Sequence, residues 1–429
     1  MKILITGANG FIGAYITAKL ISLGHEIVCA VRDVERTRLK FPNCKIVYCN
    51  FNTDHNPAVW GERLTGMDVI INAVGILQSK AGDNIHDIHA KGTIALFEGA
   101  KLAGIKKIIH ISALGIDDEK FTEYSASKRE ADLYLQSFKE IDWVILKPSL
   151  LYASGSFGGT SLLRALSVLP VIPLVGDGMQ KFQPVHMDDL TDSIAYFINK
   201  DKPTQKVIKV AGLEQLTVKE ILFSFRSWLG LKPTKAVQIP KPIIRLFCKI
   251  GDILNIAPLN STSYHMMEHG NTASAEEFIR ETEITPKSFK IALATEPLTV
   301  QSLWHARLYF LKPCICFILG VFWFMSGMIS LAVAPEKAYN LMLSLNIKPS
   351  FINILLPLGC FVDMIFGLCL MLRYKVTQVG LLQLILIFVY TVTLTVLENT
   401  LWFDPLGALM KNIPILLITL VMIAIERDK

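Results

Sequence analysis

Tyr124 and Lys128 have the side-chain types and the spacing for proton transfer beside a charged group. Residues four apart on a helix share one face, so the phenol and the ammonium group lie close together. A free phenol has a pKa of about 10, and a neighbouring cation lowers that pKa. The pair therefore predicts that Tyr124 donates a proton to a substrate oxygen. An ordinary exposed helix face is the alternative.

A glycine turn near the start of the chain has the spacing of a phosphate-binding site. It follows an apolar strand, opens a helix, and consists of Gly7, Ala8, Asn9, Gly10, Phe11, Ile12 and Gly13. Gly7 permits the tight turn, Gly10 lets backbone amides approach a pyrophosphate, and Gly13 lets helix and strand pack closely. Because a helix N-terminus favours anions, we predict that these residues bind the pyrophosphate of a dinucleotide.

Arg32, at the end of the second predicted strand, bears on which dinucleotide binds. An NAD site usually has an acid there for the ribose 2′-hydroxyl, whereas an arginine suits the 2′-phosphate of NADP. Asp33 follows one place later. We therefore predict NADP(H) as the cofactor, and NAD(H) stays the alternative.

The first 150 residues supply the elements that must position these groups. Short apolar segments alternate with amphipathic ones, which predicts a doubly wound α/β Rossmann fold with helices on both faces of a parallel sheet. The predicted strands are 2–6, 26–31, 45–49, 68–73, 107–112 and 142–148, and the predicted helices are 11–23, 57–64, 84–103 and 123–139.

From about residue 151 prolines interrupt this pattern, and a strand at 206–211 and a helix at 217–229 are the clearest elements. We expect a small irregular second lobe that sets substrate specificity, so that residues 1–230 form one NAD(P)-binding domain. Residues 231–310 are expected to be an irregular extension and linker.

The composition of residues 311–429 changes to long apolar runs. Four runs approach the roughly 20 residues that cross a hydrocarbon core, and they are 313–334, 350–372, 376–397 and 407–425. We therefore predict a bundle of four transmembrane helices. Asp363 is a functional candidate because a charge at that depth is costly, and hydrogen bonding between helices is the alternative.

Basic residues that flank these runs predict an orientation. The more basic side contains Arg307, Lys312, Arg373, Lys375, Arg427 and Lys429, and the other side contains Lys337, Lys348 and Lys411. Because the more basic side usually faces the cytoplasm, we expect a multi-pass protein of the cell (inner) membrane. Its N-terminal domain and its C-terminus would be cytoplasmic. The first residues lead directly into a strand, so no signal peptide is expected.

Charge and cysteine patterns disfavour two other classes of protein. The formal net charge is +6 but no basic stripe appears, so we expect no nucleic-acid partner. The eight cysteines form no CxxC pair, and we predict no metal site. The HxxEH match at 265–269 has no evident third ligand and is set aside as a zinc site.

The motifs together resemble the short-chain dehydrogenase/reductase superfamily. The resemblance is greatest to the extended and atypical members that include the dehydrogenase-like accessory subunit of respiratory complex I, and it covers about residues 1–230. Besides the glycine turn, it rests on Asn72-Ala73-Val74-Gly75, Ile111-Ser112-Ala113, Tyr124-Ser125-Ala126-Ser127-Lys128, Leu146-Lys147-Pro148-Ser149 and residues 182–189.

This resemblance implies a set of catalytic roles. Ser112 would orient a substrate carbonyl, Tyr124 would protonate it as hydride arrives from the nicotinamide, and Lys128 would also hold the nicotinamide ribose. Two positions depart from the family pattern: His89 stands where many members have Asn, and Lys147 stands where Arg is common. The resemblance also implies that three residues after the fourth strand contact the cofactor, namely Asn72, Ala73 and Val74.

The C-terminal region resembles the DoxX-like membrane domain that is found fused to such dehydrogenases. The residues that carry this resemblance are Leu401-Trp402-Phe403-Asp404-Pro405-Leu406-Gly407 and Lys411-Asn412. DoxX relatives are associated with quinone-linked electron transfer.

These observations predict a membrane-anchored, NADP(H)-dependent oxidoreductase that transfers hydride to or from a carbonyl or alcohol. Anchoring at the bilayer suggests an apolar small-molecule substrate such as a lipid or quinone. The alternative is a non-catalytic NAD(P)H-binding sensor or assembly factor with a membrane complex, of the respiratory type, as its partner.

Overall fold

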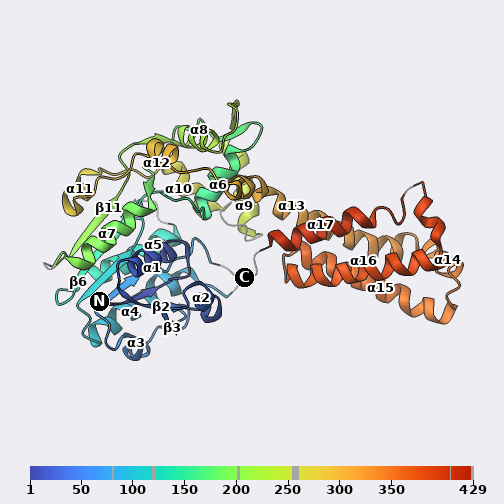
Figure 1. Ribbon diagram of the computed structural model, residues 1–429, viewed down its shortest axis with the longest axis horizontal. Coiled ribbons are helices and arrows are strands. Elements are labelled where there is room, and N and C mark those ends of the chain that lie inside the picture. Colours follow the sequence, from blue (N-terminus) through green and yellow to red (C-terminus); the bar gives the residue numbers. More distant parts are fainter. Residues whose placement is uncertain (80–81, 118–121, 201–202, 254–259, 406, 427–429) are drawn as a thin grey trace. The chain divides into compact units, whose positions relative to one another are not determined.

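The computed structural model describes the whole chain except residues 80–81, 118–121, 201–202, 254–259, 406 and 427–429. The chain forms two compact units, Met1–Ala306 and Arg307–Lys429. Figure 1 shows the first as a sheet with surrounding helices and the second as helices alone. Arg427 and Lys429, which entered the predicted orientation, lie outside the described residues.

A parallel sheet of seven strands forms the centre of the first unit, as far as the chain is described. Its order is β11-β6-β5-β4-β1-β2-β3, so the strand order reverses between β1 and β4. Ligands of such sheets bind beyond the carboxyl ends of the strands at this reversal. The strands are β1 (Lys2–Thr6), β2 (Glu26–Val31), β3 (Lys45–Tyr48), β4 (Val69–Asn72), β5 (Lys107–Ile111), β6 (Asp142–Pro148) and β11 (Lys206–Val210).

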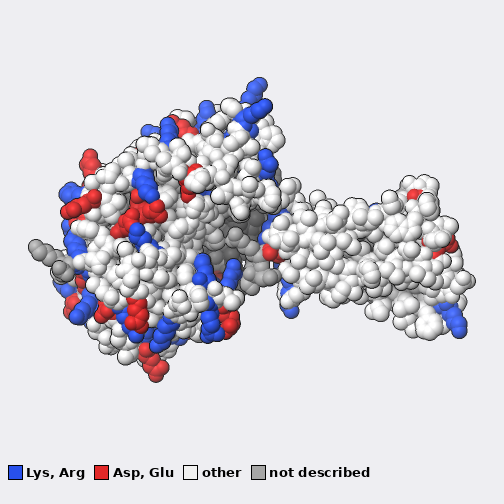
Figure 2. Space-filling model, viewed as in Figure 1, with Lys and Arg blue, Asp and Glu red and all other residues white. Residues whose placement is uncertain are grey.

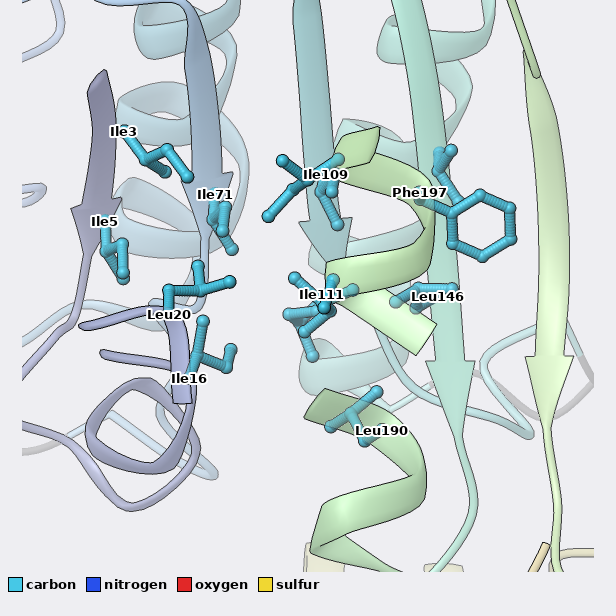
Figure 3. Close-up of a cluster of buried hydrophobic side chains, with 14 of the residues drawn as sticks. Ile3, Ile5, Ile16, Leu20, Ile71, Ile109, Ile111, Leu146, Leu190 and Phe197 are labelled. Carbon is cyan, nitrogen blue, oxygen red and sulfur yellow. The ribbon is translucent and has the colours of Figure 1, made fainter. Parts of the chain in front are cut away.

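Alternate residues of these strands fill two apolar cores, one on each face of the sheet. Figure 3 shows one face, where Ile5, Ile109 and Leu146 point toward helix residues such as Ile16 and Leu190. The helices of this face are α1 (Phe11–Ser22) and α7 (Met187–Asn199), and those of the opposite face are α3 (Pro57–Leu64), α4 (Gly92–Leu102) and α5 (Glu123–Gln136). The predicted doubly wound Rossmann fold is therefore confirmed.

Two predicted elements differ in detail. The predicted helix 84–103 is a π-helical turn, η1 (Asp87–Lys91), followed by α4. Its join at Gly92 lies against the backbone of Phe51, where an added Cβ would come within 2.5 Å of the carbonyl oxygen. A further helix, α2 (Val34–Lys40), was not predicted, and the carboxylate of Asp33 caps it by accepting a hydrogen bond from the Arg36 amide.

The second lobe has its own apolar core, which includes Tyr152, Phe225 and Phe289. The residues of this lobe are not contiguous in the chain. β11, which lies between them in the sequence, belongs to the main sheet, where it pairs with β6. Its helices are α6 (Gly158–Ser167), α8 (Val218–Trp228) and α12 (Phe289–Thr295), and its short strands pair as β7 (Leu151–Tyr152) with β10 (Val185–His186), β8 (Ile172–Val175) with β13 (Ala236–Ile239), and β9 (Lys181–Phe182) with β12 (Leu216–Thr217).

The expectation that residues 231–310 are irregular is wrong for much of their length. Besides β13 and α12 they contain α9 (Lys241–Ile253), α10 (Ser261–His269), α11 (Glu276–Thr282) and the start of α13 (Val300–Met328). A proline in this stretch does not prevent a helix where it stands in the first turn. Pro242, for example, lies in the first turn of α9, where its missing amide hydrogen has no intrahelical partner to lose.

Among the described residues three apolar helical segments are long enough to cross a membrane, and the first begins shortly before the second unit. They are Val300–Val333, which joins α13 to the π-helical turn η2 (Ile329–Val333), α15 (Pro349–Met371) and α16 (Val376–Leu397). The shorter α14 (Pro335–Ser344) and the 3-10 turn η3 (Asn399–Phe403) lie between them. α13 and α15 approach closely through Gly320 and Gly367, as small residues permit in membrane bundles.

The fourth predicted span, 407–425, is shorter than expected. α17 (Asn412–Ile425) has only 14 residues, about 21 Å at 1.5 Å per residue, against a core of about 30 Å. Gly407 has a φ of +65°, which is outside the helical region. α17 nevertheless packs along α16, and Glu426 beyond its end pairs with Lys312 and Arg373. These two cations of the predicted basic side therefore lie at one end of the bundle.

The two units differ in surface charge (Figure 2). On the face shown, acidic and basic side chains are mixed over the first unit without a basic stripe, whereas the helical unit is uncharged over most of its length and carries its charges near its ends. An uncharged lateral surface of this kind is what a hydrocarbon environment requires. The second unit is therefore a membrane domain.

Gly13 tests the close approach of α1 to the glycine turn. In Gly13→Ala the new Cβ would lie 2.1 Å from the carbonyl oxygen of Gly7, and backbone atoms cannot move aside cheaply. We expect a loss of about 1–3 kcal/mol of stability, measured as a lower melting temperature in detergent. Gly61→Ala is the control, because it meets nothing within 4 Å in α3 and should gain about 0.5–1 kcal/mol. Equal melting temperatures for the two variants would contradict the packing described here.

Candidate functional site

The glycine turn joins β1 to α1 with an open helix N-terminus. Gly7 has a φ of +68°, and a Cβ there would lie 3.0 Å from the carbonyl oxygen of Ala73. Gly10 is the N-cap of α1 and provides no side-chain hydrogen bond to the first helical amides. Those amides are therefore available to an anion such as a pyrophosphate. Ala8 is buried in the core, so only its backbone can contact a ligand.

Asn72 holds the end of β4 beside the glycine turn. Its side-chain oxygen accepts hydrogen bonds from the Thr6 hydroxyl at 2.7 Å and the Val74 amide at 3.2 Å. Its amide nitrogen lies 3.1 Å from Nδ1 of His110, to which it donates. Asn72 is fully buried. It therefore shapes the loop Ala73–Val74 rather than facing a ligand with its own side chain.

Tyr124 and Lys128 lie on one face of α5, as predicted from their spacing. The Lys128 Nζ lies 5.9 Å from the centre of the Tyr124 ring and donates a hydrogen bond to the carbonyl oxygen of Ile111 at 3.2 Å. Burial lowers the pKa of Lys128 to about 8, although the charge of Asp132 opposes this. Lys128 is therefore mostly protonated at neutral pH.

The phenol of Tyr124 differs from the expectation. Burial, together with the negative charge of Asp132, raises its pKa above the ordinary value instead of lowering it. The site holds Tyr124 as a neutral phenol, which is the protonation state that a proton donor needs.

His89 stabilises the loop after β4 and is not positioned as a proton carrier. Its Nε2 accepts a hydrogen bond from the Ile76 amide at 2.9 Å, so the ring hydrogen resides on Nδ1, which lies 3.1 Å from the Ser127 hydroxyl. Burial, with a smaller contribution from Lys128, lowers the pKa of His89 to about 2. The ring is therefore neutral and both of its nitrogens are in use.

Asp132 is the centre of a buried polar cluster behind the catalytic candidates. Its Oδ2 accepts a hydrogen bond from the Ser112 hydroxyl at 2.8 Å and lies 3.2 Å from Nζ of Lys147. Its Oδ1 faces Nε2 of His110 at 3.4 Å. Lys147 in turn pairs with the more exposed Asp117 at 2.7 Å. The hydroxyl hydrogen of Ser112 is thus directed to Asp132, which leaves its oxygen able to accept a hydrogen bond.

A cavity of about 390 Å³ lies at the carboxyl ends of β5 and β6. Tyr124 and Lys128 are the only ionisable side chains among the described residues that line it. Most other lining groups are apolar and come from the sheet, the second lobe and α10, including Val74, Ile76, Leu150, Leu151, Phe157, Leu162, Leu163, Phe182, Ile221, Met266 and Met267. The cavity therefore offers one polar corner in an apolar cleft.

Arg32 directly follows β2 and does not line the cavity. It pairs with Asp83, which also accepts a hydrogen bond from the Asn52 side chain. The neighbouring Asp33 caps α2, so one of its oxygens is already engaged. About half of the Arg32 side chain is exposed to solvent.

The structure brings some of the predicted site residues to the cavity and leaves others apart. Phe11, Ile12, Ala73, Val74, Ser112, Tyr124 and Lys128 line it, whereas Gly7, Ala8, Asn9, Gly10, Gly13, Arg32 and Asn72 do not. Asp132 and His110 were missed. Asp132 lies four residues after Lys128, so it is on the same helix face as Tyr124 and Lys128. This spacing was the sequence signal that could have identified Asp132.

The HxxEH match lies on α10, whose His265 and His269 rings stack 6.4 Å apart. Its Glu268 pairs with Lys241 at 2.9 Å. Among the described residues no group of three or more His, Cys, Asp or Glu side chains could hold a metal ion.

Comparisons with known proteins agree with this architecture. Residues 7–165 match a family described as NAD(P)H-binding, and residues 320–420 match the DoxX-like family. The 40 kDa subunit of mitochondrial NADH-ubiquinone oxidoreductase from Neurospora crassa is 25% identical over 59% of this chain and 66% of that protein. The chain thus spans about two thirds of the length of this relative.

Two further relatives are named as an assembly factor and as a reductase. The photosystem II assembly factor Ycf39 of Guillardia theta is 25% identical over 58% of this chain and 76% of that protein. Dihydroflavonol 4-reductase of Hordeum vulgare is 21% identical over 62% of this chain and 83% of its own length. Among solved structures, MoeE5 in complex with UDP-glucose and NAD matches with a TM-score of 0.54 and 16% identity, over 72% of this chain and 100% of that one. This structural likeness shows the fold.

The buried cluster around Asp132 gives a test of how the site is held. Asp132→Ala would leave Lys147 and His110 without their central partner, and breaking a buried ion pair typically costs about 3–5 kcal/mol. We expect a lower melting temperature of the full chain in detergent. Asp117→Ala is the matched control, because Asp117 also pairs with Lys147 but is about half exposed, and such pairs contribute about 0–1 kcal/mol. Similar melting temperatures for the two variants would contradict a central role for Asp132.

Proposed function

We propose that this chain, an NAD(P)-binding Rossmann domain of the short-chain-dehydrogenase type joined to a DoxX-like membrane domain, transfers hydride between NADP(H) and a carbonyl or alcohol of an apolar substrate. The observation that carries the proposal is the polar corner of the cleft. There a neutral phenol, a protonated amine and the oxygen of Ser112 lie together below an apolar wall.

The cofactor supplies the hydride when it is bound, and the chain supplies the rest. The amides of the glycine turn would hold the pyrophosphate, and Lys128 would hold the nicotinamide ribose. Tyr124 would donate its phenolic proton to the substrate oxygen as that oxygen gains negative charge. Lys128 would stabilise the resulting phenolate, since a nearby cation favours the ionised form.

The lining of the cleft supports an apolar substrate. A phosphorylated or nucleotide-linked substrate needs cationic or amide groups to replace its hydration, and the described lining offers one ammonium group, which is already assigned to the cofactor. A membrane-dissolved carbonyl compound, such as a lipid or a quinone, matches these walls better. We accordingly propose a substrate of that class.

A non-catalytic role is the second candidate. Both ring nitrogens of His89 are engaged in hydrogen bonds, and burial lowers the pKa of His89 and raises the pKa of Tyr124, so neither side chain titrates near neutrality. A sensor or assembly factor for a membrane complex would need cofactor binding alone. The names of two relatives, a respiratory-complex subunit and an assembly factor, favour keeping this candidate.

The orientation of the protein in the membrane is also a proposal. Lys312 and Arg373 lie at the same end of the helical bundle as Glu426, and we propose that this end faces the cytoplasm of a cell (inner) membrane protein. The NAD(P)-binding domain would then meet the cytoplasmic cofactor pool.

Replacing Tyr124 tests the proposed chemistry. Tyr124→Phe removes only the donated proton, so turnover should fall by about 10²–10⁴-fold while NADPH affinity changes little. NADPH consumption in native membranes with a panel of lipid aldehydes and quinones measures turnover, and fluorescence titration measures affinity. Tyr134→Phe on the same helix is the control, because its hydroxyl bonds to Glu98 away from the cavity. Unchanged turnover in Tyr124→Phe would refute the catalytic assignment, and NADPH binding without any wild-type turnover would favour the second candidate.

Arg32 tests the choice of cofactor. In Arg32→Ala the 2′-phosphate loses a charged hydrogen-bond donor, a contact of about 1.5–3 kcal/mol, so the Kd for NADPH should rise by about tenfold or more. The Kd for NADH should change little. Arg38→Ala on α2, whose partner is Glu35, is the control for general loss of positive charge. A wild type that binds NADH tenfold more tightly than NADPH would overturn the proposed cofactor.

A further inference from the structure

The helix α9 has an apolar face that the described residues of the first unit leave exposed. Ile243, Leu246, Phe247 and Ile250 follow the i, i+3, i+4, i+7 spacing of one helix face. All four side chains are exposed, with Leu246 and Phe247 at 59% and 56%. Large apolar side chains gathered on one exposed face mark an interaction surface.

α9 packs on its own unit through Cys248 and Gly251, which are buried, and its ion-paired side chains lie exposed at the edge of this contact. Lys241 pairs with Glu268 of α10 at 2.9 Å. Arg245 donates to the Tyr264 hydroxyl at 3.3 Å and stacks over that ring, and Asp252 accepts a hydrogen bond from the Ser261 amide at 3.0 Å. In a helix that only meets water, the large apolar side chains would pack inward. In α9 the buried positions are a cysteine and a glycine instead, and the four large apolar side chains named above face outward.

α10, to which α9 is fastened, is also a wall of the cleft. Met266 and Met267 of α10 line the cavity that Tyr124 and Lys128 also line. α9 and α10 therefore form a two-helix layer. Its outer surface is the apolar face of α9 and its inner surface is part of the apolar lining of the cleft.

We propose that the apolar face of α9 lies in the interfacial region of a lipid bilayer that contains anionic lipids, and that the α9–α10 layer is where an apolar substrate passes between that bilayer and the cleft. The second step rests on the proposed function, and the first does not.

Three properties favour a bilayer over other occupants. α9 carries three basic side chains, Lys241, Arg245 and Lys249, against one acidic one, Asp252, the composition typical of interfacial helices on anionic lipid. Apolar spans begin at Val300 of the same chain, so the membrane is present wherever this protein is. A four-residue stripe on one 13-residue helix is also narrow for a stable protein interface, which usually uses about 20–30 residues a side.

Photo-crosslinking of the full-length protein tests the contact. The photoreactive residue p-benzoylphenylalanine replaces Phe247 in one variant and Ile243 in a second, so that misfolding of one leaves the other. The protein is placed in nanodiscs of phosphatidylcholine and phosphatidylglycerol, and lipid adducts are measured by mass spectrometry. Position 249 is the control on the charged side of the same helix, and position 102 is the control for an exposed leucine on another helix, at the end of α4.

We expect about fivefold or more lipid adduct at positions 243 and 247 than at 249 and 102, and a smaller excess when phosphatidylcholine is the sole lipid. Equal adduct at all four positions would overturn the proposal. Crosslinks to a second copy or to another protein at positions 243 and 247, in place of lipid, would also overturn it.

A titration of the same nanodiscs with NADPH separates the two proposals. Lipid adducts without NADPH binding would leave the α9 contact standing and remove the oxidoreductase. NADPH binding and turnover without lipid adducts would support the oxidoreductase and overturn the α9 contact. For the passage of substrate, Phe247→Glu should lower turnover of a long-chain aldehyde supplied in the nanodisc but not of a short, water-soluble aldehyde. Leu39→Glu, at the most exposed leucine of α2, should alter neither, and an equal loss with both aldehydes would contradict the passage.

Discussion

A carboxylate that is removed from water must be compensated by the groups around it, and the buried Asp132 imposes this constraint on the site. Burial works against its charge, but His110, Lys147 and the Ser112 hydroxyl favour the ionised form more and hold its pKa below the ordinary value. The same charge offsets part of the cost of burying Lys128. The neighbouring strands β5 and β6 and the helix α5 are thereby held in one arrangement, since each contributes a side chain to the cluster.

The constraint also decides what the exposed side of the site can do. Because Asp132 takes the hydrogen of Ser112, that residue faces the cleft as an acceptor. Both ring nitrogens of His89 are hydrogen-bonded, one to the Ile76 amide and the other to the Ser127 hydroxyl. His89 is therefore not available to carry a proton. The neutral phenol of Tyr124 is then the group in the cleft with a proton to give, and Lys128 is the group that can stabilise what remains. The proposed chemistry thus depends on two side chains of one helix.

The sequence predicted what depends on local pattern and missed what depends on neighbours brought together by folding. The strands of the sheet follow from short apolar segments, and the YxxxK pair and the glycine turn follow from spacing. Asp132 could not be assigned because its partners, His110 and Lys147, come from two other strands whose adjacency is a property of the sheet. α2 was not predicted because its seven residues are mostly polar and because its start depends on the cap that Asp33 provides. The predicted last membrane helix was too long because the apolar composition continues through the turn at Gly407.

α9 shows why amphipathic pattern alone leaves a choice open. A helix with one apolar and one charged face can bury either in its own protein, and the usual choice is the apolar one because water is the other solvent. Where a bilayer is the other solvent, the apolar face is better placed outward and the charged face can form ion pairs within the protein, as Lys241 does with Glu268. The apolar lining of the cleft behind α10 suits the proposed substrate, since a compound that dissolves in the bilayer gains nothing from polar walls. Under the two proposals, one solvent preference accounts for both surfaces of the α9–α10 layer.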